Sequence, residues 1–176
     1  MPLVLIFWII ARAGIAMSPE GRRLFADMTV RENLIIAAEN GRKGEWTLDR
    51  VLDAFPQLVP LIDKRAGGLS GGQRQAAAIG RALLANPDVL LLDEVSLGLS
   101  PVAVEGVYVS LAAIKAARAM TMVVVEQDLT RALGFADTIL CMAEGRVELA
   151  GAPADFTRAQ ITAAYFGIHE PEGADA

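Results

Sequence analysis

Two short segments of the chain carry residues whose types and spacing suit phosphate and metal chemistry. The first is Leu69-Ser70-Gly71-Gly72-Gln73, in which Ser70 and Gln73 have the spacing of a helix capping box. Helix propensity disfavours glycine in a first turn, but glycine there leaves the amides open to another backbone or to a ligand. A helix start with a serine hydroxyl is an anion site. The segment therefore predicts a phosphate contact, with an ordinary glycine-rich helix entry as the alternative.

The second segment is an apolar run, residues 89–92, followed directly by Asp93 and Glu94. Four apolar residues are typical of a strand buried in a parallel sheet, and ligands of such sheets bind at the carboxyl ends of strands. Alternation along the strand sends the two carboxylates in opposite directions. We expect Asp93 to hold Mg²⁺ through water and Glu94 to orient and deprotonate an attacking water. The alternative is a strand that simply leaves the core.

The elements that must position these residues follow from the alternation of apolar runs with helical segments, which predicts a layered α/β domain. Prolines, capping residues and turn residues set the expected boundaries. Strands are expected at 14–17, 89–92 and 120–125, with a hairpin formed by 138–142 and 147–150. Helices are expected at 30–38, 47–55, 71–85 and 101–117, with a short one after Asp128.

Composition limits the class of protein. The chain has 176 residues, which suits one domain at about 150 residues per domain. The net charge of −5 argues against nucleic acid as a partner, and a single cysteine, Cys141, excludes an internal disulfide framework. The longest apolar run, residues 3–11, is far shorter than the roughly 20 residues of a membrane span. We therefore expect a cytoplasmic protein.

Together these residues resemble the nucleotide-binding domain of ABC transporters, a P-loop NTPase-like α/β fold with a helical subdomain. The segment from Leu69 to Gln73 resembles the family's signature motif, Val89 to Glu94 its Walker B strand with the catalytic glutamate, and residues 96–100 its D-loop. The resemblance extends from about Arg12 to Gly167.

The resemblance implies roles for these residues, with ATP and Mg²⁺ as cofactors. Asp93 is the implied Mg²⁺ ligand and Glu94 the implied general base. The signature residues are implied to contact the γ-phosphate of ATP bound to a facing subunit: Ser70, Gly71, Gly72 and, beside them, Gln73.

Residues 19–25 and 28–34 are similar, more narrowly, to the ATPase subunits of branched-chain amino acid importers. That similarity places Glu20 where other ABC domains have the Q-loop glutamine, and Gln127 where they have the switch histidine. Gln127 can donate a hydrogen bond to phosphate but cannot accept a proton as histidine does. Arg22 and Arg23 are expected to lie in a solvated loop, with contact to phosphate or to a partner as the alternative.

One family motif is absent from the chain. A P-loop requires Gly-x-x-x-x-Gly-Lys-Ser/Thr, and none of the three lysines follows a glycine. We therefore expect a single truncated domain over residues 1–176, with a helical subdomain at 29–86 that includes the signature. We expect this chain to be unable to hydrolyse ATP alone. Residues 3–10 are expected to fill the sheet as a substitute strand, or to come from a frameshift or wrong start site.

The expected function is that of an ATP-binding subunit of an importer for branched-chain amino acids, which couples ATP binding and hydrolysis to transport. Its expected partners are a second ATPase subunit and the membrane permease, on the inner face of the cell membrane. The alternative is a non-catalytic module that supplies its signature to an intact subunit. A role in chromosome maintenance is disfavoured, because only about fifty residues without sustained heptads separate Glu20 from Ser70.

Overall fold

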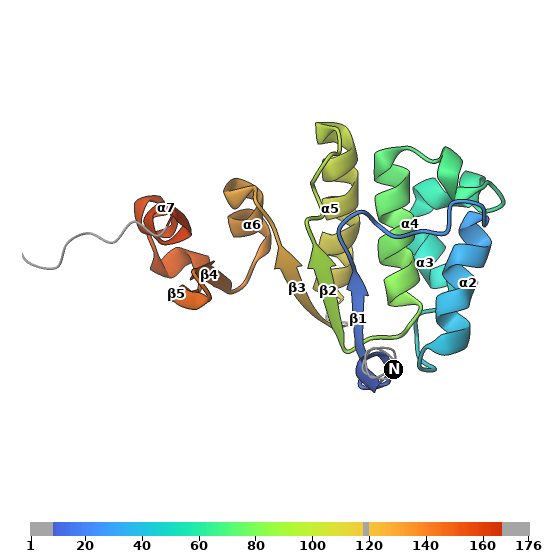
Figure 1. The fold of residues 1–176 in the computed structure, drawn as a ribbon, viewed down its shortest axis with the longest axis horizontal. Coiled ribbons are helices and arrows are strands. Elements are labelled where there is room, and N and C mark those ends of the chain that lie inside the picture. The colour runs from blue at the N-terminus through green and yellow to red at the C-terminus, as the bar shows by residue number, and fades with distance from the viewer. Residues whose placement is uncertain (1–8, 118–119, 167–176) are drawn as a thin grey trace, which may run out of the picture. The chain divides into compact units, whose positions relative to one another are not determined.

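The computed structural model describes residues 9–117 and 120–166 (Figure 1). Its contacts divide the chain into two compact units, the first ending at Glu126 and the second beginning at Gln127. None of the helices in the described ranges combines the length and the apolar character that a membrane span requires.

The first unit is built on a parallel sheet of three strands with β2 in the centre. The strands are β1 (Ile15–Ser18), β2 (Val89–Asp93) and β3 (Thr121–Val125). Ala16 pairs with Leu90, which in turn pairs with Met122. The strands predicted at 14–17, 89–92 and 120–125 are thereby confirmed to within a residue.

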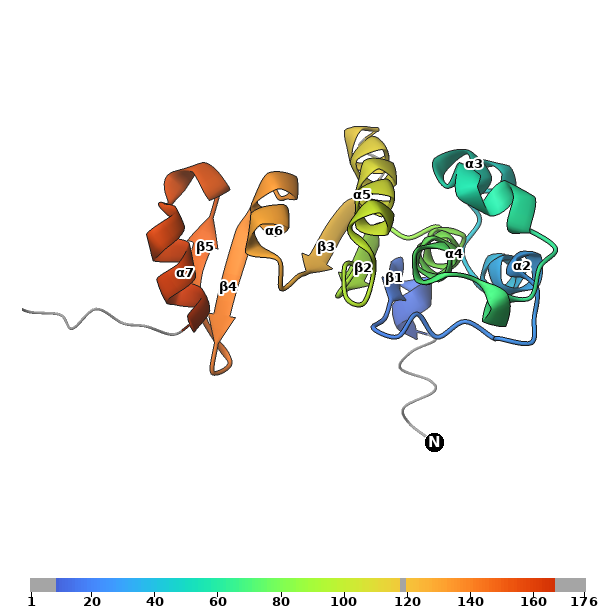
Figure 2. The same cartoon turned by 90° about the horizontal axis from the view of Figure 1, so that it is seen from above.

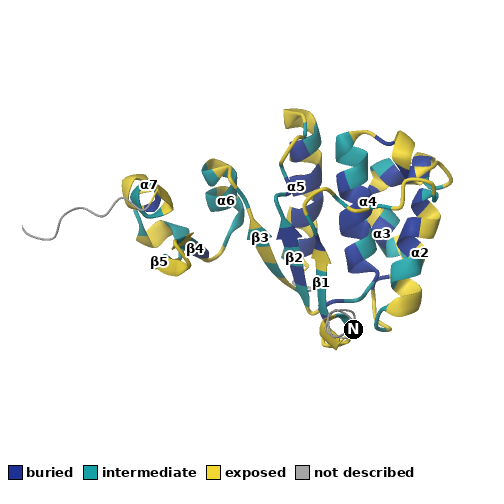
Figure 3. Cartoon of the chain, viewed as in Figure 1, coloured by how far each residue is buried: buried dark blue, intermediate teal, exposed yellow. Residues whose placement is uncertain are grey.

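Helices cover one face of this sheet (Figure 2). Along β2, Leu90 and Leu92 are fully buried, and they face α4 (Gly71–Leu83) and α5 (Pro101–Ala116), which also pack on each other. Figure 3 shows the buried residues concentrated in α4, β2 and α5. Residues of the opposite alternation are open to solvent on the outer strands, as at Val123. The sheet therefore has one buried and one open face.

The segment between β1 and β2 is helical. It comprises α2 (Val30–Asn40), α3 (Leu48–Ala54), the 3-10 turns η1 (Pro56–Leu61) and η2 (Ala66–Gly68), and α4. Its core is formed by fully buried apolar side chains, namely Val30, Leu34, Val51, Phe55, Leu58, Ile79 and Leu83. Gly80 permits a close approach between α4 and α3, because a Cβ there would lie 2.7 Å from Val51 Cγ1.

Capping explains where α2 begins. The Thr29 hydroxyl accepts a hydrogen bond from the Glu32 amide at 3.1 Å, and the Glu32 carboxylate accepts one from the Thr29 amide at 2.7 Å. This reciprocal pair satisfies two of the amides that a helix start leaves without a partner. The capping box predicted from the sequence is confirmed.

The predicted strand over residues 3–10 is wrong where the structure describes it. Residues 3–8 lie outside the described residues, but Ile9 and Ile10 lie in a helical turn, in which the Ala13 amide donates to the Ile9 carbonyl at 2.9 Å. The turn ends at Gly14, whose φ of +87° is the left-handed conformation that closes many helices. Because this turn leads directly into β1, these two residues cannot form a neighbouring strand.

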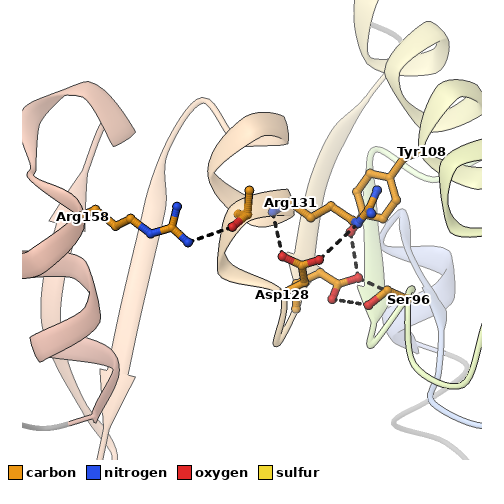
Figure 4. A network of polar contacts seen from close by, with 7 residues as sticks. Ser96, Tyr108, Asp128, Arg131 and Arg158 are labelled. Atoms are coloured by element: carbon orange, nitrogen blue, oxygen red, sulfur yellow. Dashed lines mark hydrogen bonds and ion pairs between the residues drawn. The ribbon is translucent and has the colours of Figure 1, made fainter. Parts of the chain in front are cut away.

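The second unit contains α6 (Leu129–Phe135), β4 (Ile139–Ala143), β5 (Arg146–Gly151), the 3-10 turn η3 (Pro153–Asp155) and α7 (Arg158–Phe166). The strands β4 and β5 form the predicted hairpin, with positive φ at Glu144 and Gly145, as a type I′ turn requires. The side chain of Asp128 accepts from the Arg131 amide and caps α6 as predicted. Arg158 of α7, labelled in Figure 4, donates to the Thr130 hydroxyl at 3.0 Å.

Candidate functional site

An open cavity of about 240 Å³ lies in the first unit, beyond the carboxyl ends of β1 and β2. Two segments contribute most of its wall: residues 19–25 after β1, here named the Glu20 loop, and residues 94–100 after β2, here named the Glu94 loop. The lining residues are Glu20, Gly21, Arg22, Gln75, Glu94, Leu97 and Gly98. The structure thus brings together Glu20 and Glu94, at the edge of the sheet where ligands of α/β proteins bind.

The backbone turns at Glu94. Strand β2 ends at Asp93, and Glu94 has a φ of +47°, a left-handed conformation that costs a residue other than glycine about 1–3 kcal/mol. Its amide donates to the Val125 carbonyl at 3.0 Å. The prediction that strand alternation orients both carboxylates is therefore wrong for Glu94. Asp93 remains in the strand, half-buried and paired with Val125, and Glu94 lines the cavity.

Glu126 anchors one side of the Glu94 loop. Its carboxylate accepts hydrogen bonds from the Ser96 amide at 2.9 Å, the Ser96 hydroxyl at 2.7 Å and the Tyr108 hydroxyl at 2.8 Å. Figure 4 shows Ser96 and Tyr108 in this cluster. Glu126 directly follows β3, so the cluster connects the loop after β2 to the end of the neighbouring strand. Sequence reasoning assigned Glu126 no role.

The signature segment forms the start of α4, and its predicted capping box is confirmed. The Ser70 hydroxyl accepts from the Gln73 amide at 3.3 Å, and the Gln73 side chain accepts from the Ser70 amide at 2.9 Å. A helix start leaves four amides without a partner inside the helix, and the box satisfies two of them. The amides of Gly71 and Gly72 are therefore the donors that this helix start offers to an anion.

Close packing supplies a second reason for the two glycines. A Cβ at Gly72 would lie 2.7 Å from Ala103 Cβ in α5, and one at Gly71 would lie 3.0 Å from Leu99 Cδ2. The start of α4 thus packs directly against the Glu94 loop and the start of α5. Ser70, Gly71, Gly72 and Gln73 do not line the cavity, but Gly71 packs against Leu99 and the Gly98 carbonyl in the loop that carries Glu94.

Arg22 is not the solvated residue that the sequence suggested. Its Nε donates to Gln75 Oε1 in α4 at 2.8 Å, and its Nη2 donates to the Leu97 carbonyl at 2.9 Å. Partial burial, and then the charge of Arg74, lower the pKa of Arg22. The sequence feature that could have indicated this contact is Gln75, a polar residue directly before the apolar run of α4. In the structure Gln75 is almost fully buried, so its side chain needs a hydrogen-bond partner.

The remaining predicted site residue, Gln127, is exposed and is the first residue of the second unit, two positions after β3 ends. Glu20 is also exposed, on the wall of the cavity in the first unit.

Sequence comparison connects the chain to transport proteins. A family model described as "ABC transporter" matches residues 7–96. The high-affinity branched-chain amino acid transport ATP-binding protein BraG of Pseudomonas aeruginosa is 38% identical over 161 residues, covering 90% of this chain and 69% of the relative. The probable branched-chain amino acid transport ATP-binding protein LivF of Archaeoglobus fulgidus is 39% identical over 142 residues. That match covers 80% of this chain and 60% of the relative.

Solved structures agree on the fold. The ADP conformation of an ATP-binding cassette of an ABC transporter superimposes with a TM-score of 0.71 at 25% identity, covering 90% of this chain and 67% of that chain. A dimeric cassette in a post-hydrolysis state, bound to ADP and Pi, superimposes with a TM-score of 0.72 at 23% identity. The match covers 87% of this chain and 68% of that chain. The chain therefore spans about two thirds of the cassettes that it matches, with the fold class predicted from its sequence.

Proposed function

This chain belongs to the ABC transporter family, and from that premise we propose that it is part of the ATP-binding subunit of an importer for branched-chain amino acids. One observation carries the proposal at the level of the site: the glycine-rich start of α4 packs against the loop that carries Glu94. The names of the two relatives from Pseudomonas aeruginosa and Archaeoglobus fulgidus support the substrate class.

We assign the chemistry to two carboxylates. Glu94 acts as the general base that orients and deprotonates water, and Asp93 holds Mg²⁺. Carboxylate oxygens suit Mg²⁺, and no group of three or more His, Cys, Asp or Glu residues in the described ranges forms a metal cage. A carboxylate such as that of Asp93 fits Mg²⁺, which is bound through one or two carboxylates while phosphates and water complete its coordination. ATP, when bound, supplies the phosphoryl group that is transferred to water.

The other predicted residues surround this chemistry. Gly71 and Gly72, with Ser70 and Gln73, are proposed to contact the γ-phosphate of ATP on a facing subunit. The reason is that the start of α4 offers the backbone amides of Gly71 and Gly72 as donors to an anion. Glu20 is proposed to contact the bound cofactor from the cavity wall, and Gln127 is proposed to donate a hydrogen bond to phosphate.

We propose two kinds of partner. One is a second ATPase subunit, whose P-loop holds the ATP that the signature of this chain contacts. The others are the membrane permease subunits, which residues 30–62 and the Glu20 loop face, so that the chain is peripheral to the inner face of the membrane. The net charge of −5 disfavours nucleic acid as a partner.

A non-catalytic role is the second candidate, and the absence of a P-loop motif from these 176 residues favours it. In this case the chain contributes its signature to an intact subunit and does not turn over ATP itself.

The test is a phosphate-release assay with Mg-ATP. The purified chain alone is expected to show no turnover, whereas adding it to an intact ABC ATPase subunit that carries a P-loop is expected to raise the turnover of that subunit. Gly71→Asp should abolish the increase, because it places a carboxylate at the anion site. Gly106→Ala, on the exposed face of α5, is the matched control and should preserve the increase.

Two outcomes would contradict the proposal. Turnover by the pure chain that is lost in Glu94→Gln would show that it hydrolyses ATP without a partner. An unchanged rate in the mixture would exclude action in trans. If the mixture turns over faster even when this chain carries Glu94→Gln, the non-catalytic role is correct.

A further inference from the structure

We propose that Arg22 is a positioning residue that fastens both the Glu20 loop and the Glu94 loop to helix α4. The two loops carry the carboxylates on the cavity wall, and Arg22, a residue of the Glu20 loop, lines the same cavity. The inference rests on the proposed function, in which Glu94 performs the chemistry, and it adds a residue that fixes where Glu94 lies.

The guanidinium of Arg22 joins three segments that are far apart in the sequence. Its Nε donates to Gln75 of α4 at 2.8 Å and its Nη2 to the Leu97 carbonyl at 2.9 Å, across 53 and 75 residues. Both acceptors are neutral oxygens, so the contact is a geometric one and not an ion pair. The guanidinium holds donors on separate nitrogens in a fixed planar fork, a geometry that the single ammonium nitrogen of lysine does not reproduce.

The backbone beneath Arg22 is fixed from α4 as well. Arg22 and Arg23 have φ values of +64° and +45°, in the left-handed region that residues other than glycine rarely adopt. Arg81 of α4 donates to both of their carbonyls, at 3.2 Å to Arg22 and 2.8 Å to Arg23. A strained backbone conformation persists only where several surrounding contacts hold it in place, and such strain clusters at functional sites. The Glu20 loop therefore presents Arg22 in one defined direction.

The Glu94 loop is thereby anchored at two neighbouring residues. Glu126 accepts the hydrogen bonds of Ser96, and Arg22 donates to the carbonyl of Leu97. Removal of the Arg22 side chain leaves the Ser96 anchor intact and releases the Leu97 side, which includes Gly98. A shift of the Glu20 loop must therefore be transmitted to the loop that carries Glu94.

Hydrogen–deuterium exchange of the full chain tests this role without reference to ATP. In Arg22→Ala, the amides of residues 95–100 are expected to exchange about tenfold faster, as the loss of one hydrogen bond to a charged donor implies. Arg22→Lys should restore little of this protection, because lysine cannot reach both acceptors. Protection within α4 should remain as in the wild type.

Arg23→Ala is the matched control. It removes the same charge from the same loop, at the same kind of left-handed backbone, but Arg23 contributes its carbonyl and not its side chain to the contacts with Arg81. It should leave exchange at 95–100 unchanged. Unchanged exchange in Arg22→Ala would overturn the proposal, and so would a uniform loss of protection across α4 and α5, which indicates general destabilisation.

A kinetic measurement separates positioning from ATP binding. In the mixture with an intact ATPase subunit, Arg22→Ala is expected to lower the stimulated kcat about tenfold while the KM for ATP changes less than twofold. A higher KM at constant kcat would overturn the proposal. If the wild-type chain does not stimulate turnover at all, the proposed function fails, and the exchange experiment still decides whether Arg22 positions the Glu94 loop.

Discussion

Arg81 illustrates at the residue scale how one side chain supports an unfavourable backbone. Two successive left-handed residues, Arg22 and Arg23, cost about 1–2 kcal/mol each relative to ordinary conformations. Arg81 compensates with hydrogen bonds to both carbonyls, and its guanidinium lies 6.0 Å from the centre of the Phe25 ring. Burial lowers the pKa of Arg81, but an arginine remains charged throughout the physiological range.

Replacing Arg81 with methionine should therefore destabilise the chain by about 1–3 kcal/mol, because the carbonyls of Arg22 and Arg23 both lose their donor. Urea unfolding followed by circular dichroism measures the change. Arg31→Met is the control: its ion pair with Asp63 is exposed at both ends, and surface pairs contribute at most about 1 kcal/mol. Equal losses in the two variants would show that Arg81 acts as an ordinary surface residue.

At the scale of elements, α4 is the helix on which the others assemble. It contacts β1, β2, α2, α3 and α5, and its buried face consists largely of alanine with Gly80 among them. Small side chains allow neighbouring backbones to approach closely, which explains a helix rich in alanine and glycine at the centre of the first unit. The same requirement operates at Gly71 and Gly72, where α4 meets α5 and the Glu94 loop.

The role of Gly80 is testable with a matched pair. In Gly80→Ala the new Cβ would lie 2.7 Å from Val51, a β-branched side chain that cannot yield easily, so we expect a loss of about 1–2 kcal/mol despite the better helix propensity. Gly106→Ala adds a Cβ that meets nothing within 4 Å and should stabilise the chain by about 0.5–1 kcal/mol. Thermal or urea unfolding of both variants measures the difference, and the same sign for both would contradict this account.

The capping box of α2 predicts a pH dependence. Hydrogen bonds from the backbone amide and then the hydroxyl of Thr29 lower the pKa of Glu32. A lowered pKa means that the contribution to stability is complete above the ordinary pKa of about 4.3 and is lost as the pH falls through the lower folded value. Glu32→Gln should therefore be less stable than the wild type at pH 7, and the difference should shrink toward pH 3. A difference that grows on acidification would refute the assignment.

At the scale of the whole molecule, the first unit is an α/β layer with helices on one face of its sheet. Leu92 points to the covered face and is 1% exposed, whereas Val123, on the neighbouring strand with the opposite alternation, is 47% exposed. Because side chains alternate strictly along a strand, the pattern of a single strand determines which residues contribute to the core.

Truncating these two residues should have very different effects. Leu92→Ala is expected to cost about 2–5 kcal/mol, because it leaves a cavity between the sheet and the helices. Val123→Ala should cost less than about 1 kcal/mol, since its side chain is half open to solvent. Urea titration of the purified full chain distinguishes the two. A loss above 2 kcal/mol for Val123→Ala would mean that this face of the sheet is covered.

Local chemistry was sufficient to predict most of the elements. The capping boxes at Thr29 and Ser70, the buried strands and the hairpin turn at Glu144 and Gly145 all depend on residues within a few positions of one another, so they are visible in the sequence. The signature and Walker B resemblance, and with it the family, followed from such local patterns.

Tertiary structure alone decided what lies around the cavity. The left-handed turn at Glu94, the Glu126 cluster and the fork of Arg22 depend on contacts between residues far apart in the chain, 53 and 75 positions in the case of Arg22. Periodicity and spacing report only which face a residue takes within its own element. Which oxygens a side chain such as that of Arg22 meets is set by the packing of helices and strands, and no local pattern encodes it.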